Sequence, residues 1–386
     1  MELTGRRILI TGAGGFVGSR LCEVLTLGYP DVQICAVVRN MGRASRIGRL
    51  RIDIVKGDIT DKAFVNSFVP EFDVIIHLAT GGYGGIVHGT KYLLAAAFRS
   101  GVTRFVHMSS AAVYGLKPDL SCVDELAPLH RTGNPYSDAK IKAERTVQTY
   151  IKRGLPAVIL RPRIVFGPYS PWVTRVIEEA RRGKLILVDD GDGACNTVYI
   201  DNLVHAILLA VTTDDAPGHT FFITDGEQVT WREFKLALSE SVTPNLSTGH
   251  VDSEHFLKNG TPTASWLMAN VRGFGRFLTS AELRRAIRHV PIFSQGLDAI
   301  MDWAYGLPED KQLRIKERLG LLHRTRPRAA EGVDIPSADQ VLRESGKGFA
   351  KIDRARRILR YDPIVSFREG LEITKSWLQF DGMLSS

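Results

Sequence analysis

The fold of this chain follows from the stretch ITGAGGFVGSRL, residues 10–21. It joins a β-branched apolar run, residues 6–11, to a predicted helix, and it spaces Gly12, Gly15 and Gly18 as GxxGxxG. Glycine suits a tight turn and a close approach of the backbone to a pyrophosphate, and a helix N-terminus offers free N–H groups. The stretch therefore predicts a dinucleotide-binding turn. The cofactor-binding residues expected here are Gly12, Gly15, Phe16, Val17 and Gly18.

The rest of the first 170 residues alternates short β-branched runs with helical stretches. Nearly continuous apolar runs suit a parallel sheet that is buried on both faces. Helices are expected over 16–28 and 88–101, the second ended by Gly101. The predicted fold class is α/β, with a Rossmann-type doubly wound parallel sheet. Its strands are expected at 6–11, 32–38, 53–58, 73–79, 104–110 and 156–162.

The pattern changes after about Gly167. Helices become more frequent, arginines cluster, and the strands that remain, 185–188 and 220–224, are short. We expect a dinucleotide-binding domain over 1–166, to which later segments return. A smaller, mainly helical domain over 167–386 is expected to bind the substrate.

Two patterns near the C-terminus concern this second domain. TSAE, residues 279–282, is a capping box that opens a basic helix, and residues 322–340 are expected to form a loop on their Pro, Gly and charge content. The basic helix around 284–288 is a candidate for membrane or polymer association, and a solvated face is the simpler interpretation.

Composition excludes several classes of protein. The 386 residues are 44% hydrophobic and 24% charged, as is usual for a globular protein, and no run of about 18 apolar residues predicts a transmembrane segment. The N-terminus lacks a secretory pattern, and the four cysteines form no CxxC pair, so we expect a cytoplasmic protein with reduced thiols and no metal. The net charge of +8 favours phosphate-bearing ligands, and no nucleic-acid motif accompanies it. The expected partners are a small-molecule substrate and a second copy of the chain.

The end of the second strand indicates which dinucleotide binds. A carboxylate there accepts from the ribose 2′-OH of NAD, whereas an arginine accommodates the 2′-phosphate of NADP. The stretch AVVRNMGRASR supplies Arg39, Arg43 and Arg46 and no carboxylate. NADP is therefore expected, with NAD as the alternative if the arginines form only a solvated cluster. Further residues expected to line the cofactor are Asp58, Ile59, Leu78, Ala79, Thr80 and Pro162.

The stretch NPYSDAKIKAER, residues 134–145, places Tyr136 and Lys140 four residues apart on one helix face. A tyrosine titrates near pH ~10 and needs a nearby cation to stabilise its phenolate. The lysine is placed to do this and to hold the nicotinamide ribose. Ser110 follows the fifth strand and is a hydrogen-bond partner for a substrate oxygen. The three groups would polarise a C–O bond while hydride is transferred; the alternative is a surface helix.

The combination of these motifs is specific. TGxxGxxG, the strand-end serine, YxxxK, RPRIVFGP and NTVYIDNLVHAI together resemble the extended short-chain dehydrogenase/reductase family over about residues 5–225. The likeness is to NAD-dependent epimerase/dehydratase-like members, with features similar to the 3β-hydroxysteroid dehydrogenase-like branch. It implies that Ser110, Tyr136 and Lys140 are the catalytic set, with Tyr136 as the acid–base.

The chain departs from the family pattern at five positions. Ala111 and Ala112 stand where dehydratases carry an acidic pair, which argues against a 4,6-dehydratase. Ile86, Ile164 and Cys195 stand where nucleotide-sugar epimerases use polar contacts. The sequence therefore predicts a substrate pocket more apolar than theirs.

Three functions remain open from the sequence. The leading one is an NAD(P)-dependent oxidoreductase that interconverts a secondary alcohol and a ketone. The alternative is a nucleotide-sugar epimerase that uses tightly bound NAD for transient oxidation and re-reduction. The remote alternative is a non-catalytic dinucleotide sensor, a class that usually lacks the tyrosine or the lysine.

Overall fold

The computed structural model describes residues 1–121, 123–183, 185–242, 246–259 and 336–383. Within them, the centre of the molecule is a seven-stranded sheet in the order β10-β6-β5-β4-β1-β2-β3, and each adjacent pair is parallel. The strands are β1 Arg7–Thr11, β2 Gln33–Val38, β3 Asp53–Lys56, β4 Val74–His77, β5 Arg104–Met108, β6 Ala157–Pro162 and β10 Thr220–Ile223.

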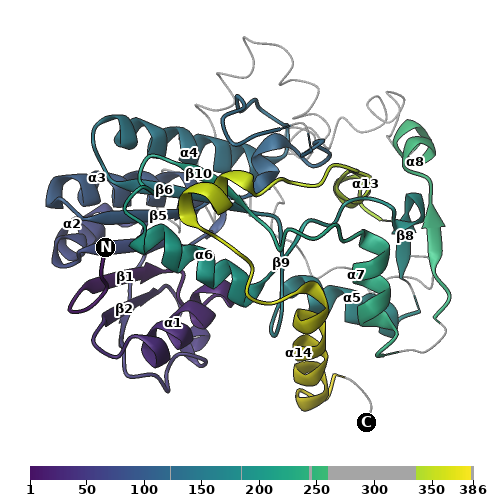
Figure 1. The fold of residues 1–386 in the computed structure, drawn as a ribbon, viewed down its shortest axis with the longest axis horizontal. Coiled ribbons are helices and arrows are strands. Elements are labelled where there is room, and N and C mark those ends of the chain that lie inside the picture. Colours follow the sequence, from purple (N-terminus) through teal and green to yellow (C-terminus); the bar gives the residue numbers. More distant parts are fainter. Residues whose placement is uncertain (122, 184, 243–245, 260–335, 384–386) are drawn as a thin grey trace, which may run out of the picture.

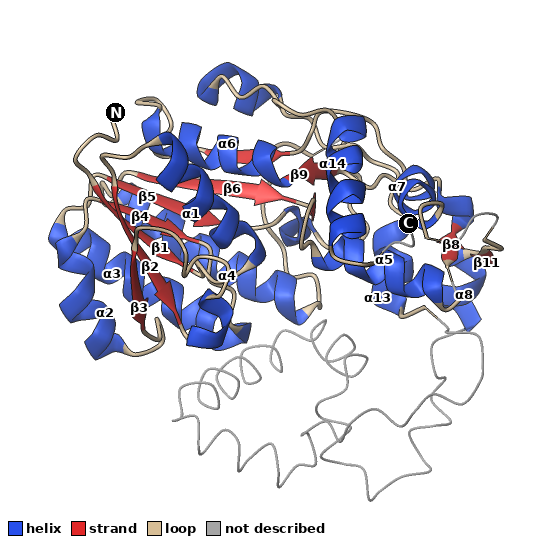
Figure 2. Cartoon of the chain, turned by 90° about the horizontal axis from the view of Figure 1, so that it is seen from below, coloured by secondary structure: helices blue, strands red, loops and turns tan. Residues whose placement is uncertain are grey.

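Helices cover both faces of this sheet (Figure 2). Successive residues of a strand point to opposite faces. Ile8 and Ile10 therefore pack in one core with α1 and α6, whereas Leu9 packs in the other with α2, α3 and α4. The helices are α1 Phe16–Gly28, α2 Lys62–Phe68, α3 Thr90–Ser100, α4 Pro135–Lys152 and α6 Ile200–Thr212. The predicted doubly wound α/β fold is confirmed.

The strand order places a ligand crevice at one point. β1 lies between β2 and β4, and the chain builds the sheet outward from β1 in both directions. Ligands of doubly wound sheets bind where this order reverses, outside the carboxyl ends of the strands. Thr11 is in register with His77, so the ends of β1 and β4 together form the floor of that crevice.

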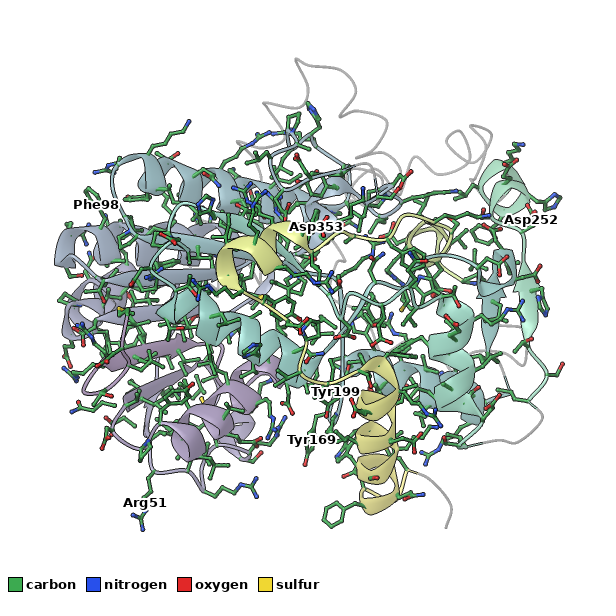
Figure 3. All side chains as sticks on the ribbon, viewed as in Figure 1. Arg51, Phe98, Tyr169, Tyr199, Asp252 and Asp353 are labelled. Carbon is green, nitrogen blue, oxygen red and sulfur yellow. The ribbon has the colours of Figure 1, made fainter. Side chains whose placement is uncertain are left out.

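A second, smaller group of elements lies beside the sheet (Figure 1). Its core gathers Phe166, Tyr199, Trp231 and Phe234. Tyr169 and Tyr199 lie along α14 in Figure 3, and the ring of Tyr169 is 4.8 Å from that of Trp377. The elements are β7 Ile164–Phe166, α5 Pro171–Arg181, β8 Ile186–Val188, β9 Thr197–Tyr199, α7 Trp231–Ser239, β11 Gly249–Val251, α8 Ser253–Asn259, α13 Ala338–Glu344 and α14 Phe367–Phe380.

The chain crosses between these two groups more than once. β10 and α6 both follow residue 166, yet β10 pairs with β6 at the edge of the large sheet and α6 packs on its face. None of the helices in the described part of the chain combines the length and apolar character that a bilayer crossing needs.

Some predicted boundaries differ from the structure. The helix expected over 88–101 begins at Thr90, because residues Gly84–Gly89 form a π-type turn, and it ends before Gly101, whose φ is 68°. The last part of the loop expected over 322–340 is wrong, since Ser337 caps α13 and the helix begins at Ala338. Residues 279–282, 284–288 and 322–335 lie outside the described residues.

Candidate active site

The turn after β1 leaves no room for a side chain at Gly12 or Gly18. Gly12 has a φ of 75°, and a Cβ there would lie 2.7 Å from the Ala79 nitrogen. A Cβ on Gly18 would lie 2.4 Å from the Gly12 oxygen. The Gly15 N–H donates to this same oxygen at 2.9 Å, and α1 begins at Phe16 without a capping side chain among the described residues. The first N–H groups of α1 are therefore free for an anion.

A first cavity of about 320 Å³, the Arg39 cavity, opens beside this turn at the ends of β1, β2, β3 and β4. In the described part of the chain, the exposed Arg39 forms no ion pair. The side chain of Asp58 accepts from both the N–H and the hydroxyl of Thr60 at 2.8 Å. The residues expected at the cofactor that line this cavity are Gly12, Gly15, Arg39, Asp58, Ile59, Leu78, Ala79 and Thr80.

The predicted arginine cluster divides in the structure. Arg43 lines the Arg39 cavity, but Arg46 turns away from it. Arg46 forms an ion pair with Glu23 at 3.2 Å and lies 4.0 Å above the ring of Tyr169. The sequence places Arg43 and Arg46 close behind Arg39, and of these two only Arg43 lines the cavity, because the buried Glu23 carboxylate and the Tyr169 ring hold Arg46.

A second cavity of about 500 Å³, the Tyr136 cavity, adjoins the first. The two share Gly12, Gly15, Leu78 and Thr80, so an extended ligand can pass from one to the other over the turn. The remaining residues expected at the site line this cavity: Phe16, Val17, Gly18, Ser110, Tyr136, Lys140 and Pro162.

Helix α4 positions the tyrosine. The Asn134 side chain accepts from the N–H groups of Tyr136 and Ser137 at 3.1 Å, which starts the helix one residue before Tyr136. Tyr136 lines the cavity and is 44% exposed. Partial burial raises the pKa of Tyr136, and the neighbouring Ser110 side chain partly lowers it. The phenol is therefore protonated at neutral pH.

Lys140 lies one turn further along α4 and is only 2% exposed. Its Nζ donates to the Met108 carbonyl at 2.7 Å and lies 5.9 Å from the ring centroid of Tyr136. Burial lowers the pKa of Lys140 to about 8, against the opposing effect of Glu144. The ammonium group is still mainly cationic at neutral pH. Because burial lowers its pKa, the group loses its proton only about one pH unit above neutral.

Behind the cavity, α4 and β6 contribute to a paired layer made of Tyr114, Glu125, Glu144 and Arg161. The Arg161 guanidinium donates to both carboxylate oxygens of Glu144, at 2.9 and 2.5 Å. It also donates to the Tyr114 hydroxyl at 2.6 Å and to the Glu125 carbonyl at 3.1 Å. These contacts satisfy a buried charge and hold α4 on the sheet.

The structure also adds lining residues that the sequence did not indicate. They include Ser109, Trp172, Leu203, Arg163 and Arg343. Arg163 directly follows Pro162 in RPRIVFGP, so its position at the strand end could have been predicted from the sequence. No local pattern connects residue 343 to this site.

Of the three positions expected to make the pocket more apolar, one lines the Tyr136 cavity. Ile164 lines the Tyr136 cavity. Ile86 packs with Ala139 and Ala143, and Cys195 is buried in the core around Trp231; among the described residues, neither belongs to the cavity lining. The local sequence could not show this, because each side chain is drawn into a core formed by distant elements.

The donor set fits a nicotinamide dinucleotide. The free N–H groups of α1 suit the pyrophosphate, Arg39 lies in the cavity on one side, and Lys140 and Tyr136 lie in the cavity on the other. Within the described ranges, no group of three His, Cys, Asp or Glu side chains is arranged to hold a metal ion.

Comparison with known proteins places the chain in a family described as NAD dependent. The chain matches the NAD dependent epimerase/dehydratase family over residues 8–223. It is 31% identical over 269 residues to the 2-alkyl-3-oxoalkanoate reductase of Stenotrophomonas maltophilia, covering 61% of this chain and 76% of that protein. It is 30% identical over 247 residues to the dTDP-D-glucose 4,6-dehydratase of Mus musculus, covering 56% of this chain and 68% of that protein.

Among solved structures, the UDP-glucuronic acid 4-epimerase of Bacillus cereus, in complex with UDP-glucuronic acid and NAD, superimposes with a TM-score of 0.65. The alignment covers 97% of this chain and 99% of that one at 20% identity, a level that shows the fold alone. The family match spans more than half of the chain. The protein therefore belongs to the NAD dependent epimerase/dehydratase family, among the extended short-chain dehydrogenases/reductases.

Proposed function

We propose that the protein is an NADP-dependent reductase that interconverts a ketone and a secondary alcohol on a small-molecule substrate. The observation that carries this proposal is the arrangement of the Tyr136 cavity. Tyr136 and Ser110 both line it, Lys140 is buried one helical turn away from Tyr136, and the cavity adjoins the glycine turn.

The three side chains have distinct tasks in this reaction. When bound, the dinucleotide supplies the hydride that reduces the carbonyl carbon. Tyr136 gives its phenolic proton to the carbonyl oxygen, and Ser110 donates a hydrogen bond that orients this oxygen. Lys140, cationic below about pH 8, stabilises the phenolate left on Tyr136. Tyr136 is protonated at neutral pH because its pKa is raised above the ordinary value, so it can act as the proton donor in the reduction direction.

The preference for NADP rests on Arg39. This side chain lines the cavity at the end of β2, where a ribose 2′-substituent would lie. A guanidinium without an ion pair among the described residues is well suited to a phosphate. If the Arg39 side chain is only solvated and contacts no ligand, the bound dinucleotide is NAD.

Dehydration and epimerisation, two other reactions of this family, are the alternatives to reduction. Dehydration needs a second acid near the substrate, but Ala112 lines the Tyr136 cavity and no Asp or Glu is found among its described lining residues. Epimerisation uses the same three groups as reduction and is the second candidate. It is favoured by the family to which the chain belongs.

The test is a paired screen with the purified protein. Cyclic ketones and 3-oxo esters with NADPH form one arm, and UDP- and dTDP-sugars with NADP or NAD form the other. We expect stoichiometric loss of NADPH absorbance with a ketone. Interconversion of a nucleotide sugar without net cofactor change would instead establish the epimerase.

We also propose the domain division, the compartment and the assembly. Residues 1–166 with α6, β10 and residues 352–361 would form the dinucleotide-binding domain, and most of residues 167–386 would form the substrate domain. The cytoplasm is supported by the buried, unpaired cysteines of the described chain, Cys22, Cys35 and Cys195. A homodimer is the expected assembly, and sedimentation of the purified protein measures it.

A further inference from the structure

The start of helix α4 is in contact with a residue from the far end of the chain. Asn134, the N-cap, accepts from the N–H groups of Tyr136 and Ser137 through its Oδ1, at 3.1 Å each. Its Nδ2 donates to the Asp339 carboxylate of α13 at 3.0 Å. One amide side chain therefore joins the helix that carries Tyr136 to an element 205 positions later.

The Asp339 contact selects the orientation of this amide. The oxygen and the nitrogen of a side-chain amide are similar in size, but only the oxygen can accept from backbone N–H groups. An ionised carboxylate accepts and does not donate. Asp339 therefore favours the orientation in which Nδ2 faces α13 and Oδ1 faces the two N–H groups of α4. With the amide reversed, both the cap and the contact with Asp339 would be lost.

The position of Asp339 is itself fixed by buried contacts at the other end of α13. Glu344, the last residue of this helix, accepts from the Lys235 Nζ at 2.7 Å, and both side chains are buried. The same Nζ donates to the Ile186 carbonyl at 2.7 Å. α13 is thus attached to the smaller group of elements, and Asp339 connects that group to the start of α4.

Local contacts also hold the first turn of α4, but they do not orient the amide. The Asp138 side chain accepts from the N–H and the hydroxyl of Thr132, at 2.8 and 3.0 Å. The Thr132 hydroxyl in turn accepts from the Asn134 N–H at 3.2 Å. These contacts use the backbone of Asn134 and not its side chain, so the orientation of the amide depends on Asp339.

We propose that Asp339 is a positioning residue for the reduction: acting through Asn134, it holds the first turn of α4 and with it the phenol of Tyr136. Tyr136 is the second residue of α4, so loss of the cap acts directly on its backbone. Asp339 is not among the described residues that line the Tyr136 cavity, which leaves α4 as its route to the site. A misplacement of about 1 Å can lower a rate about 10²-fold. The inference rests on the proposed function, because it takes Tyr136 as the proton donor.

The first experiment measures the cap without turnover, by amide hydrogen exchange of the purified protein. Asp339→Ala should speed exchange of the Tyr136 and Ser137 amides about fivefold, as for loss of much of a capping interaction. Asp339→Asn keeps an oxygen that can accept from Asn134 and should exchange at nearly the wild-type rate. The amides of α6 are the internal reference and should not change. Equal exchange in the wild type and Asp339→Ala would overturn the proposal.

The matched control is Gln340→Ala. Gln340 follows Asp339 on α13, and in the described part of the chain its side chain forms no hydrogen bond. Its loss should leave amide exchange and turnover unchanged. An equal effect in Gln340→Ala would show that α13 as a whole is responsible and would overturn the role of Asp339. If thermal unfolding shows that Asp339→Ala does not fold, Asp339→Ser takes its place.

The second experiment measures the reduction of ethyl acetoacetate by NADPH. Asp339→Ala should lower kcat about tenfold with little change in either KM, and Asp339→Asn should restore it. Asn134→Ser keeps a capping oxygen but removes the donor to Asp339. In that background Asp339→Ala should have no further effect, because its effect passes through Asn134.

The double variant decides whether Asp339 acts through the cap. A second tenfold loss of kcat in this variant would overturn the proposal, since Asp339 would then act by another route. Faster exchange in Asp339→Ala, together with a wild type that reduces no ketone, would support the positioning of Tyr136 and contradict only the proposed function.

Discussion

The wall of the Tyr136 cavity and the paired layer behind it are built by the same elements, but they differ in how completely their buried polar groups are hydrogen-bonded. α4 presents Tyr136 to the cavity and Glu144 to the layer. Arg161 in β6 is bonded on all sides, whereas Arg163, two residues later, keeps a buried Nε without a partner among the described residues. The comparison shows that a complete set of partners holds the buried charge of Arg161 in place, whereas the buried charge of Arg163 lacks part of such a set.

Replacing Tyr136 by Phe should have the largest effect on the cavity side. Loss of the acid–base hydroxyl is expected to reduce kcat by about 10²–10⁴-fold, and the dinucleotide Kd and Tm should change little. Steady-state kinetics and calorimetry measure these quantities. The matched control is Tyr114→Phe in the paired layer, which should lower Tm and leave kcat nearly intact. Similar kinetic losses in both variants would remove the distinction between the two regions.

Replacing Glu144 by Gln tests the paired layer. The Arg161 guanidinium would then be buried without its counter-charge, so the free energy of unfolding should fall by about 3–5 kcal/mol. Urea denaturation of the variant and the wild type measures this difference. A loss below about 1 kcal/mol would show that the layer tolerates an unpaired arginine and would weaken the comparison.

Replacing Arg39 by Ala should change cofactor choice. One charge-assisted contact to a phosphate contributes ~1.5–3 kcal/mol, so the ratio of NADP to NAD affinity should shift about tenfold or more toward NAD. Arg46→Ala is the control, since Arg46 pairs with Glu23 outside the cavity. Equal losses for both dinucleotides, or a wild type that prefers NAD, would show that Arg39 is only a surface residue.

The lowered pKa of Lys140 predicts that activity falls and stability rises as the pH increases. Its pKa in the fold is about 8, below the ordinary 10.5. As pH rises from about 8 to about 9, the cation is lost and kcat/KM should fall about fivefold. The unfolded chain binds more protons over the interval between the two values, so the stability contribution of Lys140 should rise there. Parallel pH profiles of kcat/KM and of unfolding, compared with Lys140→Met, test this. A flat activity profile would show that the cationic form is not required.

Much of the site was readable from the sequence because it is locally encoded. The succession of apolar runs and helical stretches predicted the doubly wound sheet, and its boundaries differ by one or two residues at several elements, among them β3, β4, β5 and α3. GxxGxxG and YxxxK describe a turn and a helix face, whose geometry depends on residues a few positions apart. All residues predicted at the cofactor and the catalytic set line one of two adjoining cavities; their roles stay predictions.

Only the tertiary structure determined which distant side chains line the same cavity. Arg163 and Arg343 line the same cavity although they lie far apart in the chain, and no periodicity relates such distant positions. The same cause separated Arg46 from Arg39 and drew Ile86 and Cys195 into cores away from the cavity. Local sequence thus determined the turn, the helix face and the fold class through short-range geometry. Long-range packing determined the character of the substrate pocket, because burial and pairing depend on whichever distant groups compete for each side chain.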